Sequence, residues 1–260
     1  MAELMRIKSL TKRFAGLTAV NDLSFEMSKR SIHALIGPNG AGKTTIINMI
    51  TGVHKPTEGS IEFAGTECAG LRNFEIARLG ISRTFQNLKL YTSMTVLENL
   101  MTGAHAGTSQ GIVGFIFNIP RAIKEERALR EKAEEILDYI GLRDVENEYV
   151  GNLPYGKQKM TEFGRALMTD PKLLLLDEPA AGLNPSERVV FTQLIRRTFD
   201  KGIDIFLIEH NMDIIMNISN KITVINFGSK IAEGTPYDIQ NNEEVIKAYL
   251  GEKYQQIGEK

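Results

Sequence analysis

Apolar residues gather in short runs, and glycine-containing turns separate these runs along much of the chain. Three early runs read as strands of an antiparallel sheet: residues 5–9, 19–27 and 60–63. Four other runs are short and almost wholly apolar, as buried strands of a parallel sheet are: residues 31–36, 172–176, 203–208 and 222–225. Helical patterns lie between these four runs. The alternation predicts an α/β fold, in which a mostly parallel sheet carries helices on both faces.

The start of one helix is well marked by its first residues. Asn184 is placed to cap the helix, Pro185 takes its first position, and Glu187 completes a capping box. Gly202 provides the glycine expected just beyond the end of such a helix.

Strand signals fade between residues 87 and 152, where charged helical stretches take over. The clearest stretch spans residues 123–140, with Glu, Lys and Arg interleaved among Ala, Leu and Ile. It predicts a helical subdomain, at about residues 87–159, inserted into a single domain that spans residues 1–260. The polar tail at residues 252–260 is expected to be loose.

Composition and charge narrow the classes of function. The 260 residues carry a net charge of −1, which gives no electrostatic footprint for nucleic acid, so no nucleic-acid partner is expected. The single cysteine, Cys68, can form neither an internal disulfide nor a thiolate metal site. The longest apolar run, residues 112–119, is far shorter than the ~20 residues of a membrane span, and Met1–Leu10 lacks the apolar core of a signal peptide. A cytoplasmic protein is expected.

A phosphate-binding loop is the strongest chemical signal in the sequence. Residues 37–44 match GxxxxGK[ST] and lie between a predicted strand and a predicted helix at residues 43–50. Glycines let backbone N–H groups surround phosphate oxygens, Lys43 brings a cation to the β- and γ-phosphates, and Thr44 offers a hydroxyl to Mg²⁺. The residues expected to hold ATP here are Gly37, Pro38, Asn39, Gly40, Ala41, Gly42, Lys43, Thr44 and Thr45. The alternative is a glycine-rich turn with a solvated lysine, and the loop alone does not choose among kinases, GTPases and ATPases.

Two carboxylates follow a second buried strand. Asp177 and Glu178 stand at its carboxyl end, the edge at which α/β sheets bind ligands. Asp177 is expected to orient Mg²⁺ through water, and Glu178 to act as the general base toward the attacking water. A solvated turn after the strand is the alternative.

The segment Leu-Pro-Tyr-Gly-Lys-Gln at residues 153–158 opens a predicted helix that runs through Leu167. In its place along the chain it resembles the Leu-Ser-Gly-Gly-Gln signature of the ABC ATPase family. The resemblance implies that this segment faces the phosphate loop of a second ATPase subunit, so that Tyr155, Gly156 and Gln158 bind the nucleotide of the partner. Two residues depart from the family pattern: Pro154 replaces the serine, with loss of a hydroxyl and a backbone N–H, and Tyr155 replaces a glycine.

Further motifs follow in the family's order. Gln86, in Thr-Phe-Gln at the end of a short predicted strand, resembles the family's loop glutamine that contacts Mg²⁺, and Phe14 resembles the aromatic residue that stacks on adenine. Residues 181–184 resemble the loop that crosses the dimer interface. His210 resembles the switch histidine that contacts the γ-phosphate, so the resemblance implies that Glu178, His210 and Lys43 are the catalytic residues. The other histidines are expected to be structural: His33, His54 and His105.

The ATPases of branched-chain amino acid importers are the form that the sequence resembles most. The similar segments are Arg-Thr-Phe-Gln-Asn at 83–87, Met-Thr-Val-Leu-Glu-Asn-Leu at 94–100, Asp-Glu-Pro-Ala-Ala-Gly-Leu-Asn-Pro at 177–185 and Ile-Glu-His-Asn-Met at 208–212. The resemblance implies ATP and Mg²⁺ as cofactors, and a place on the cytoplasmic face of the plasma membrane. It implies three kinds of partner: a second ATPase, two permease subunits and, indirectly, an extracytoplasmic solute-binding protein. Residues 87–101, with Tyr91, and residues 112–119 are the candidates for permease docking.

Other functions remain open at this point. The cargo could be urea or a short amide, because closely similar ATPases serve those importers. A non-transport ABC ATPase is disfavoured because the chain has neither a long coiled-coil insertion nor a second cassette. A purely regulatory ATP sensor is disfavoured because Glu178 and His210 are both present.

Overall fold

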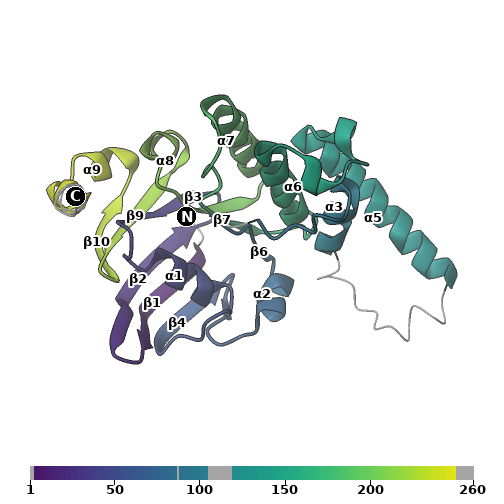
Figure 1. The fold of residues 1–260 in the computed structure, drawn as a ribbon. Coiled ribbons are helices and arrows are strands. Elements are labelled where there is room, and N and C mark those ends of the chain that lie inside the picture. The colour runs from purple at the N-terminus through teal and green to yellow at the C-terminus, as the bar shows by residue number, and fades with distance from the viewer. Residues whose placement is uncertain (1–2, 87, 105–118, 250–260) are drawn as a thin grey trace.

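Two sheets form the centre of the computed structural model, which describes residues 3–86, 88–104 and 119–249 (Figure 1). The first sheet is antiparallel, with the strand order β2-β1-β4-β5. Its strands are β1 (Glu3–Phe14), β2 (Leu17–Ser28), β4 (Glu58–Phe63) and β5 (Thr66–Glu67).

The second sheet has six strands in the order β10-β9-β3-β8-β7-β6. All neighbouring strands are parallel except β10, which pairs with β9 in the antiparallel sense. The strands are β3 (Ile32–Ile36), β6 (Ile81–Arg83), β7 (Leu173–Asp177), β8 (Asp204–Ile208), β9 (Lys221–Asn226) and β10 (Ser229–Gly234). The prediction of a mostly parallel sheet beside an antiparallel one is confirmed.

Helices flank both sheets, and three of them form a group at one end of the molecule (Figure 1). They are α1 (Lys43–Ile50), α2 (Asn73–Leu79), α3 (Val96–Ala104), α5 (Ile119–Ile140), α6 (Tyr155–Leu167), α7 (Pro185–Asp200), α8 (Met212–Ile218) and α9 (Pro236–Gln240), with short 3-10 turns at Arg143–Val145 and Val150–Asn152. Helices α3, α5 and α6 pack together beyond the edge of the parallel sheet, whereas α1 lies over the antiparallel sheet (Figure 1). No helix among the described residues is long and apolar enough to cross a membrane.

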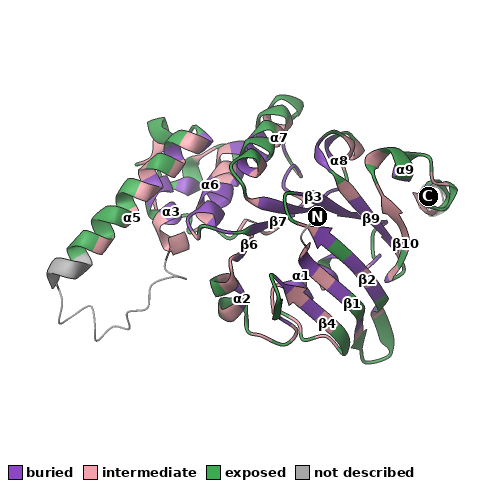
Figure 2. Ribbon diagram, turned by 180° about the vertical axis from the view of Figure 1, so that it is seen from behind, coloured by how far each residue is buried: buried purple, intermediate pink, exposed green. Residues whose placement is uncertain are grey.

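The parallel sheet is buried on both faces, because successive side chains of a strand point to opposite sides. Leu173 and Leu175 of β7 belong to the core shared with the antiparallel sheet and α1. Leu174 and Leu176 belong to the core shared with α7 and the helical group. Buried residues accordingly run through the centre of the molecule, and exposed ones cover the outer helices (Figure 2).

Several element boundaries differ from the predicted ones. Strands β1 and β2 are longer than expected, since irregular pairing lets them continue past polar residues. Helix α5 begins at Ile119, four residues before its predicted start, and α2 and β10 were not predicted. The expected limits of the helical subdomain stay a prediction. His105 and the tail at 252–260 lie outside the described residues, as does the apolar run at 112–119 apart from Ile119.

Candidate functional site

Four neighbouring parallel strands bring the candidate residues to one edge of the sheet. Strands β3, β8, β7 and β6 lie side by side, and the carboxyl ends of parallel strands meet at the same edge. The phosphate loop follows β3 and His210 follows β8. Asp177 ends β7 with Glu178 directly after it, and Arg83 ends β6. Residues that are far apart in the sequence therefore meet at a single site.

The phosphate loop has the backbone shape that its glycines permit. Gly40 and Gly42 have φ angles of 77° and 103°, in the left-handed region that favours glycine. A Cβ atom on Gly42 would lie 2.6 Å from the Ala19 carbonyl oxygen, so only glycine fits there. Lys43 is buried, and its Nζ donates to the carbonyl oxygens of Gly37 at 2.6 Å and Pro38 at 2.9 Å. Helix α1 begins at this lysine without any acidic residue in its first turn, which suits an anion at its N-terminus.

Phe14 stands at the end of β1 with 39% of its surface exposed. Its ring meets His54 edge-on at 5.3 Å between centroids, and the Lys12 ammonium lies 4.9 Å from the ring centroid. Because Phe14 is exposed, part of its surface is available for a stacked base. The structural role expected for His54 stays a prediction.

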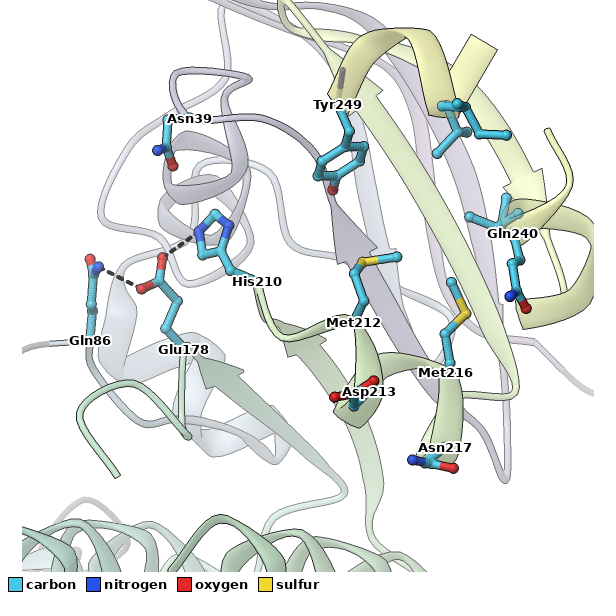
Figure 3. Close-up of a pocket in the computed structure, with 13 residues that line it drawn as sticks. Asn39, Gln86, Glu178, His210, Met212, Asp213, Met216, Asn217, Gln240 and Tyr249 are labelled. Atoms are coloured by element: carbon cyan, nitrogen blue, oxygen red, sulfur yellow. Dashed lines mark hydrogen bonds and ion pairs between the residues drawn. The ribbon is translucent and has the colours of Figure 1, made fainter. Parts of the chain in front are cut away.

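Glu178 lies between two other predicted site residues. Its Oε1 is 2.9 Å from Nε2 of His210, and its Oε2 accepts a hydrogen bond of 2.8 Å from Nε2 of Gln86 (Figure 3). The three side chains line one end of a cleft of about 1050 Å³, which continues past Asn39 to α8 and the segment after α9. Gln86 itself lies beyond the end of β6, which stops at Arg83, and not at the end of the strand as predicted.

The backbone of Glu178 is unusual for a residue with a side chain. Its φ angle is 49°, and its N–H donates to the Ile208 carbonyl oxygen at 2.8 Å. This bond joins the carboxyl end of β7 to that of β8, the strand that His210 follows. The turn therefore positions the carboxylate beside the imidazole.

Asp177 is buried and paired with a cation that the sequence analysis missed. Its Oδ2 accepts a hydrogen bond of 2.7 Å from Nη2 of Arg83, and the two side chains are only 3% and 9% exposed. The position of Arg83, three residues before Gln86, could have marked it as a site residue. Its contact with Asp177 could not be predicted from the sequence, because the contact depends on the pairing of β6 with β7.

Glu209 is a second residue that the sequence analysis missed. Its side chain is buried, and its two oxygens accept hydrogen bonds from the backbone N–H groups of Ala180 at 2.8 Å, His210 at 2.9 Å and Asn211 at 3.2 Å. The carboxylate thus ties the loop that carries His210 to the loop that follows Glu178.

The signature residues form a separate group at the start of α6. A Cβ on Gly182 would lie 2.8 Å from the Tyr155 ring, and one on Gly156 would lie 2.5 Å from Glu187, so both residues pack against the 181–184 loop and α7. Gln158 donates through Nε2 to the Leu153 carbonyl oxygen at 2.9 Å, within its own helix end. The expected contacts of these residues with a partner's nucleotide stay a prediction.

Helix α6 is also hydrogen-bonded to the segment around Gln86. The Lys159 ammonium is buried and donates to the Gln86 carbonyl oxygen at 3.3 Å. Burial lowers the pKa of Lys159, although the Glu162 carboxylate opposes the shift. Glu162 in turn accepts from the Lys89 N–H at 3.2 Å. The glutamine segment and the signature helix are therefore connected through buried polar groups.

The donor set at the site fits Mg²⁺. Within the described part of the chain, no cluster of three or more His, Cys, Asp or Glu residues could hold a metal by itself. Thr44, Gln86 and Asp177 offer a hydroxyl, an amide oxygen and a carboxylate, which are the hard oxygen ligands that Mg²⁺ takes together with phosphate and water. The fit therefore depends on a bound nucleotide.

A buried strand, a glycine-rich phosphate loop and a helix, with two carboxylates at the end of a neighbouring strand, define the chain as a P-loop nucleoside triphosphatase.

Comparison with known proteins identifies the family. A family model described as "ABC transporter" matches residues 20–181, and a model described as "Branched-chain amino acid ATP-binding cassette transporter" matches residues 229–255. The chain belongs to the ATP-binding domains of ABC transporters, a family of ATPases.

Relatives match the chain over almost its full length. A high-affinity branched-chain amino acid transport ATP-binding protein of Pseudomonas aeruginosa, BraF, is 42% identical over 96% of this chain and 98% of the relative. LivG of Escherichia coli K12, which carries the same description, is 42% identical with the same coverage. A crystal structure of an ABC transporter cassette in its ADP conformation superposes with a TM-score of 0.84 and 34% identity, over 96% of this chain and all of that one.

Proposed function

We propose that this chain is the ATP-hydrolysing subunit of an importer for branched-chain amino acids. Its place in the ABC transporter family and the fit of the C-terminal segment to the branched-chain family model support the cargo. The relatives described as branched-chain amino acid transport proteins support it further. The observation that carries the hydrolytic role is the Glu178 carboxylate, held between Gln86 and His210 at the cleft.

The residues divide the work of hydrolysis among them. The backbone of residues 37–45 surrounds the phosphates, Lys43 turns from the loop carbonyls to the β- and γ-phosphates, and Phe14 stacks on adenine. Glu178 accepts a proton from the attacking water, and His210 donates through Nε2 to the γ-phosphate. Thr44, Gln86 and Asp177 would hold Mg²⁺, which supplies charge to the phosphate oxygens and orients them when bound.

In this proposal the chain works as part of a transporter with several other subunits. A second ATPase subunit closes over the nucleotide with its own residues equivalent to Tyr155, Gly156 and Gln158. Two permease subunits dock near Tyr91, whose side chain is 54% exposed, and place the chain on the cytoplasmic face of the membrane. A solute-binding protein delivers the amino acid outside.

Replacement of Glu178 by Gln tests the hydrolytic role. We expect ATP binding to persist and turnover to fall about a hundredfold or more, because the amide cannot take the proton of the water. Fluorescent ATP titration and phosphate release measure the two quantities. Turnover near that of the wild type would remove Glu178 from the role.

The cargo is tested by uptake. Cells that lack the chain and cells that carry the E178Q variant should lose uptake of labelled leucine, isoleucine and valine, and the wild-type chain should restore it. The same cells are assayed with labelled urea and acetamide. Loss of urea or amide uptake, with leucine uptake intact, would assign the chain to the alternative cargo.

A further inference from the structure

Arg83 occupies a central place at the site, although no motif of the phosphate loop or the acidic pair includes it. It ends β6, the strand next to β7, and its side chain is 9% exposed. Its guanidinium reaches two elements at once: Nη2 donates to Oδ2 of Asp177 at 2.7 Å, and Nη1 donates to Oδ1 of Asn48 at 2.7 Å. The guanidinium carbon also lies 4.9 Å from the centroid of the Phe85 ring.

These contacts fix the arginine in one position. The guanidinium is planar and rigid, so two hydrogen bonds from its two terminal nitrogens determine its orientation. Asn48 belongs to α1, the helix that begins at the phosphate loop, and Asp177 belongs to the acidic motif. Arg83 therefore sets the position of Asp177 relative to the helix behind the phosphates.

The charge of Arg83 is also needed where it lies. The Asp177 side chain is 3% exposed, and a buried carboxylate is costly unless a cation or hydrogen-bond donors compensate it. Arg83 provides both a positive charge and a donor to one oxygen, Oδ2. The hydrogen bond orients the carboxylate through Oδ2, and Oδ1 is the other oxygen that the carboxylate can offer to a ligand.

We infer that Arg83 is a positioning residue for the metal: its bonds to Asp177 and Asn48 hold the Asp177 carboxylate so that Oδ1 serves the water shell of a nucleotide-bound divalent cation. This inference rests on the proposed binding of Mg²⁺ and ATP at the site. Partners that orient a ligand without touching the metal commonly change metal affinity by about 10–100-fold when they are removed.

The test measures the magnesium dependence of nucleotide binding without hydrolysis. The purified full-length chain is titrated with MgCl₂ in the presence of a fluorescent, non-hydrolysable ATP analogue, and the affinity for the analogue without Mg²⁺ is measured separately. The first variant is R83M, which removes the charge and both hydrogen bonds. The second is R83K, which keeps the charge but lacks the planar guanidinium with its two terminal nitrogens. R197M is the control for loss of an arginine. Arg197 also combines a hydrogen bond with a ring contact, but both are to Tyr139 and the residue lies on α7.

We expect R83M to raise the Mg²⁺ concentration at half-saturation about tenfold and to change the magnesium-free affinity by less than about threefold. The Mg²⁺ midpoint of R83K should lie between those of R83M and the wild type, since lysine restores the charge with only one hydrogen bond. If R83M does not fold, the midpoint of R83K tests the inference. R197M should match the wild type.

Three results would overturn the inference. The Mg²⁺ midpoints of R83M and R83K could equal that of the wild type. They could be lower, which would mean that Arg83 competes with the metal. Binding with and without Mg²⁺ could weaken by the same factor together with the melting temperature, which would show a purely structural role. A wild-type chain that binds the analogue with no magnesium dependence contradicts the proposed metal site as well, whereas the other outcomes contradict only the role of Arg83.

Discussion

Single side chains hold the loops of this site by serving several backbone groups at once. Glu209 is the clearest case, because one buried carboxylate accepts from three N–H groups on two loops. The hydrogen bonds of a charged acceptor are stronger than those of a neutral one, and an unsatisfied buried donor is costly. A substitution at Glu209 should therefore shift the positions of both His210 and Glu178.

Replacement of Glu209 by Gln tests this dependence. The amide has a single acceptor oxygen, so its NH₂ group must face a backbone donor. We expect kcat to fall about tenfold or more with the KM for ATP nearly unchanged, and the free energy of unfolding to fall by about 1–3 kcal/mol. Steady-state kinetics and urea denaturation measure these effects, with the exposed Glu131→Gln as control. A loss of stability with an unchanged kcat would show that Glu209 only supports the fold.

His33 makes the stability of the chain depend on pH. It is fully buried between Phe25 and Phe206, its Nε2 lies 2.8 Å from Thr223 Oγ1, and burial lowers its pKa from 6.5 to about 3. The unfolded chain binds a proton at this position below about pH 6.5 and the folded chain does not, so stability falls as the pH drops from about 6.5 toward 3.

The expected loss between pH 7.5 and pH 5.5 is about 1 kcal/mol from this histidine alone. Urea denaturation at the two pH values measures it. The Gln side chain in His33→Gln can still hydrogen-bond with Thr223 but does not titrate, so the variant should lose that part of the pH dependence. An equal pH dependence in both proteins would contradict the assignment to His33.

Some helices and strands could be predicted from their own sequence, and others could not. The start of α7 was predicted correctly, because a capping box is formed by residues three positions apart: Asn184 accepts from the Glu187 N–H at 2.9 Å, and Glu187 accepts from the Asn184 N–H at 2.9 Å. Strand β10 was missed because its sequence, Ser-Lys-Ile-Ala-Glu-Gly, has only two apolar side chains, and the strand is held by its pairing with β9.

The same contrast applies to the site. The phosphate loop and the position of Glu178 after a buried strand are local patterns, and the structure has both. The contacts of Arg83, Lys159 and Glu209 join segments brought together by sheet order and helix packing, so neighbouring residues in the sequence carry no record of them. Gln158 donates to the Leu153 carbonyl oxygen in this structure, and its expected contact with the nucleotide of a partner stays a prediction.

The cap of α7 has a measurable energy. Replacement of Asn184 by Ala removes the acceptor for the Glu187 N–H, and we expect the free energy of unfolding to fall by about 1 kcal/mol. Urea denaturation checks it, with the exposed Asn147→Ala as control. Because Asn184 also ends the loop that packs on Tyr155, a lower ATP turnover in a variant of normal stability would indicate a role beyond the cap.

The proposed catalytic residues Glu178 and His210 line an open cleft, and the signature residues form a different group on α6. A complete site in the proposed mechanism therefore needs the signature group of another subunit. The chain alone is expected to bind nucleotide and to hydrolyse it slowly.

Light scattering coupled to size exclusion tests this expectation on the E178Q variant. We expect ATP to double the molecular mass, since the nucleotide stays bound between two copies, and removal of ATP to restore the monomer. A Lys43→Ala variant, which lacks the cation proposed to bind the phosphates, should stay monomeric and serves as the control. A persistent monomer in E178Q would point either to pairing with a different ATPase or to a signature loop that Pro154 has weakened too far to close over the nucleotide.

The left-handed backbone of Glu178 sets stability against the proposed catalysis at a single position. A side chain in this conformation costs about 1 kcal/mol, a cost that glycine does not carry. Exchange of Glu178 for glycine would therefore relieve the backbone and, at the same time, remove the carboxylate that the proposed mechanism uses as general base. A laboratory selection for thermal stability alone would be free to make that exchange, whereas a selection for ATP turnover would reject it.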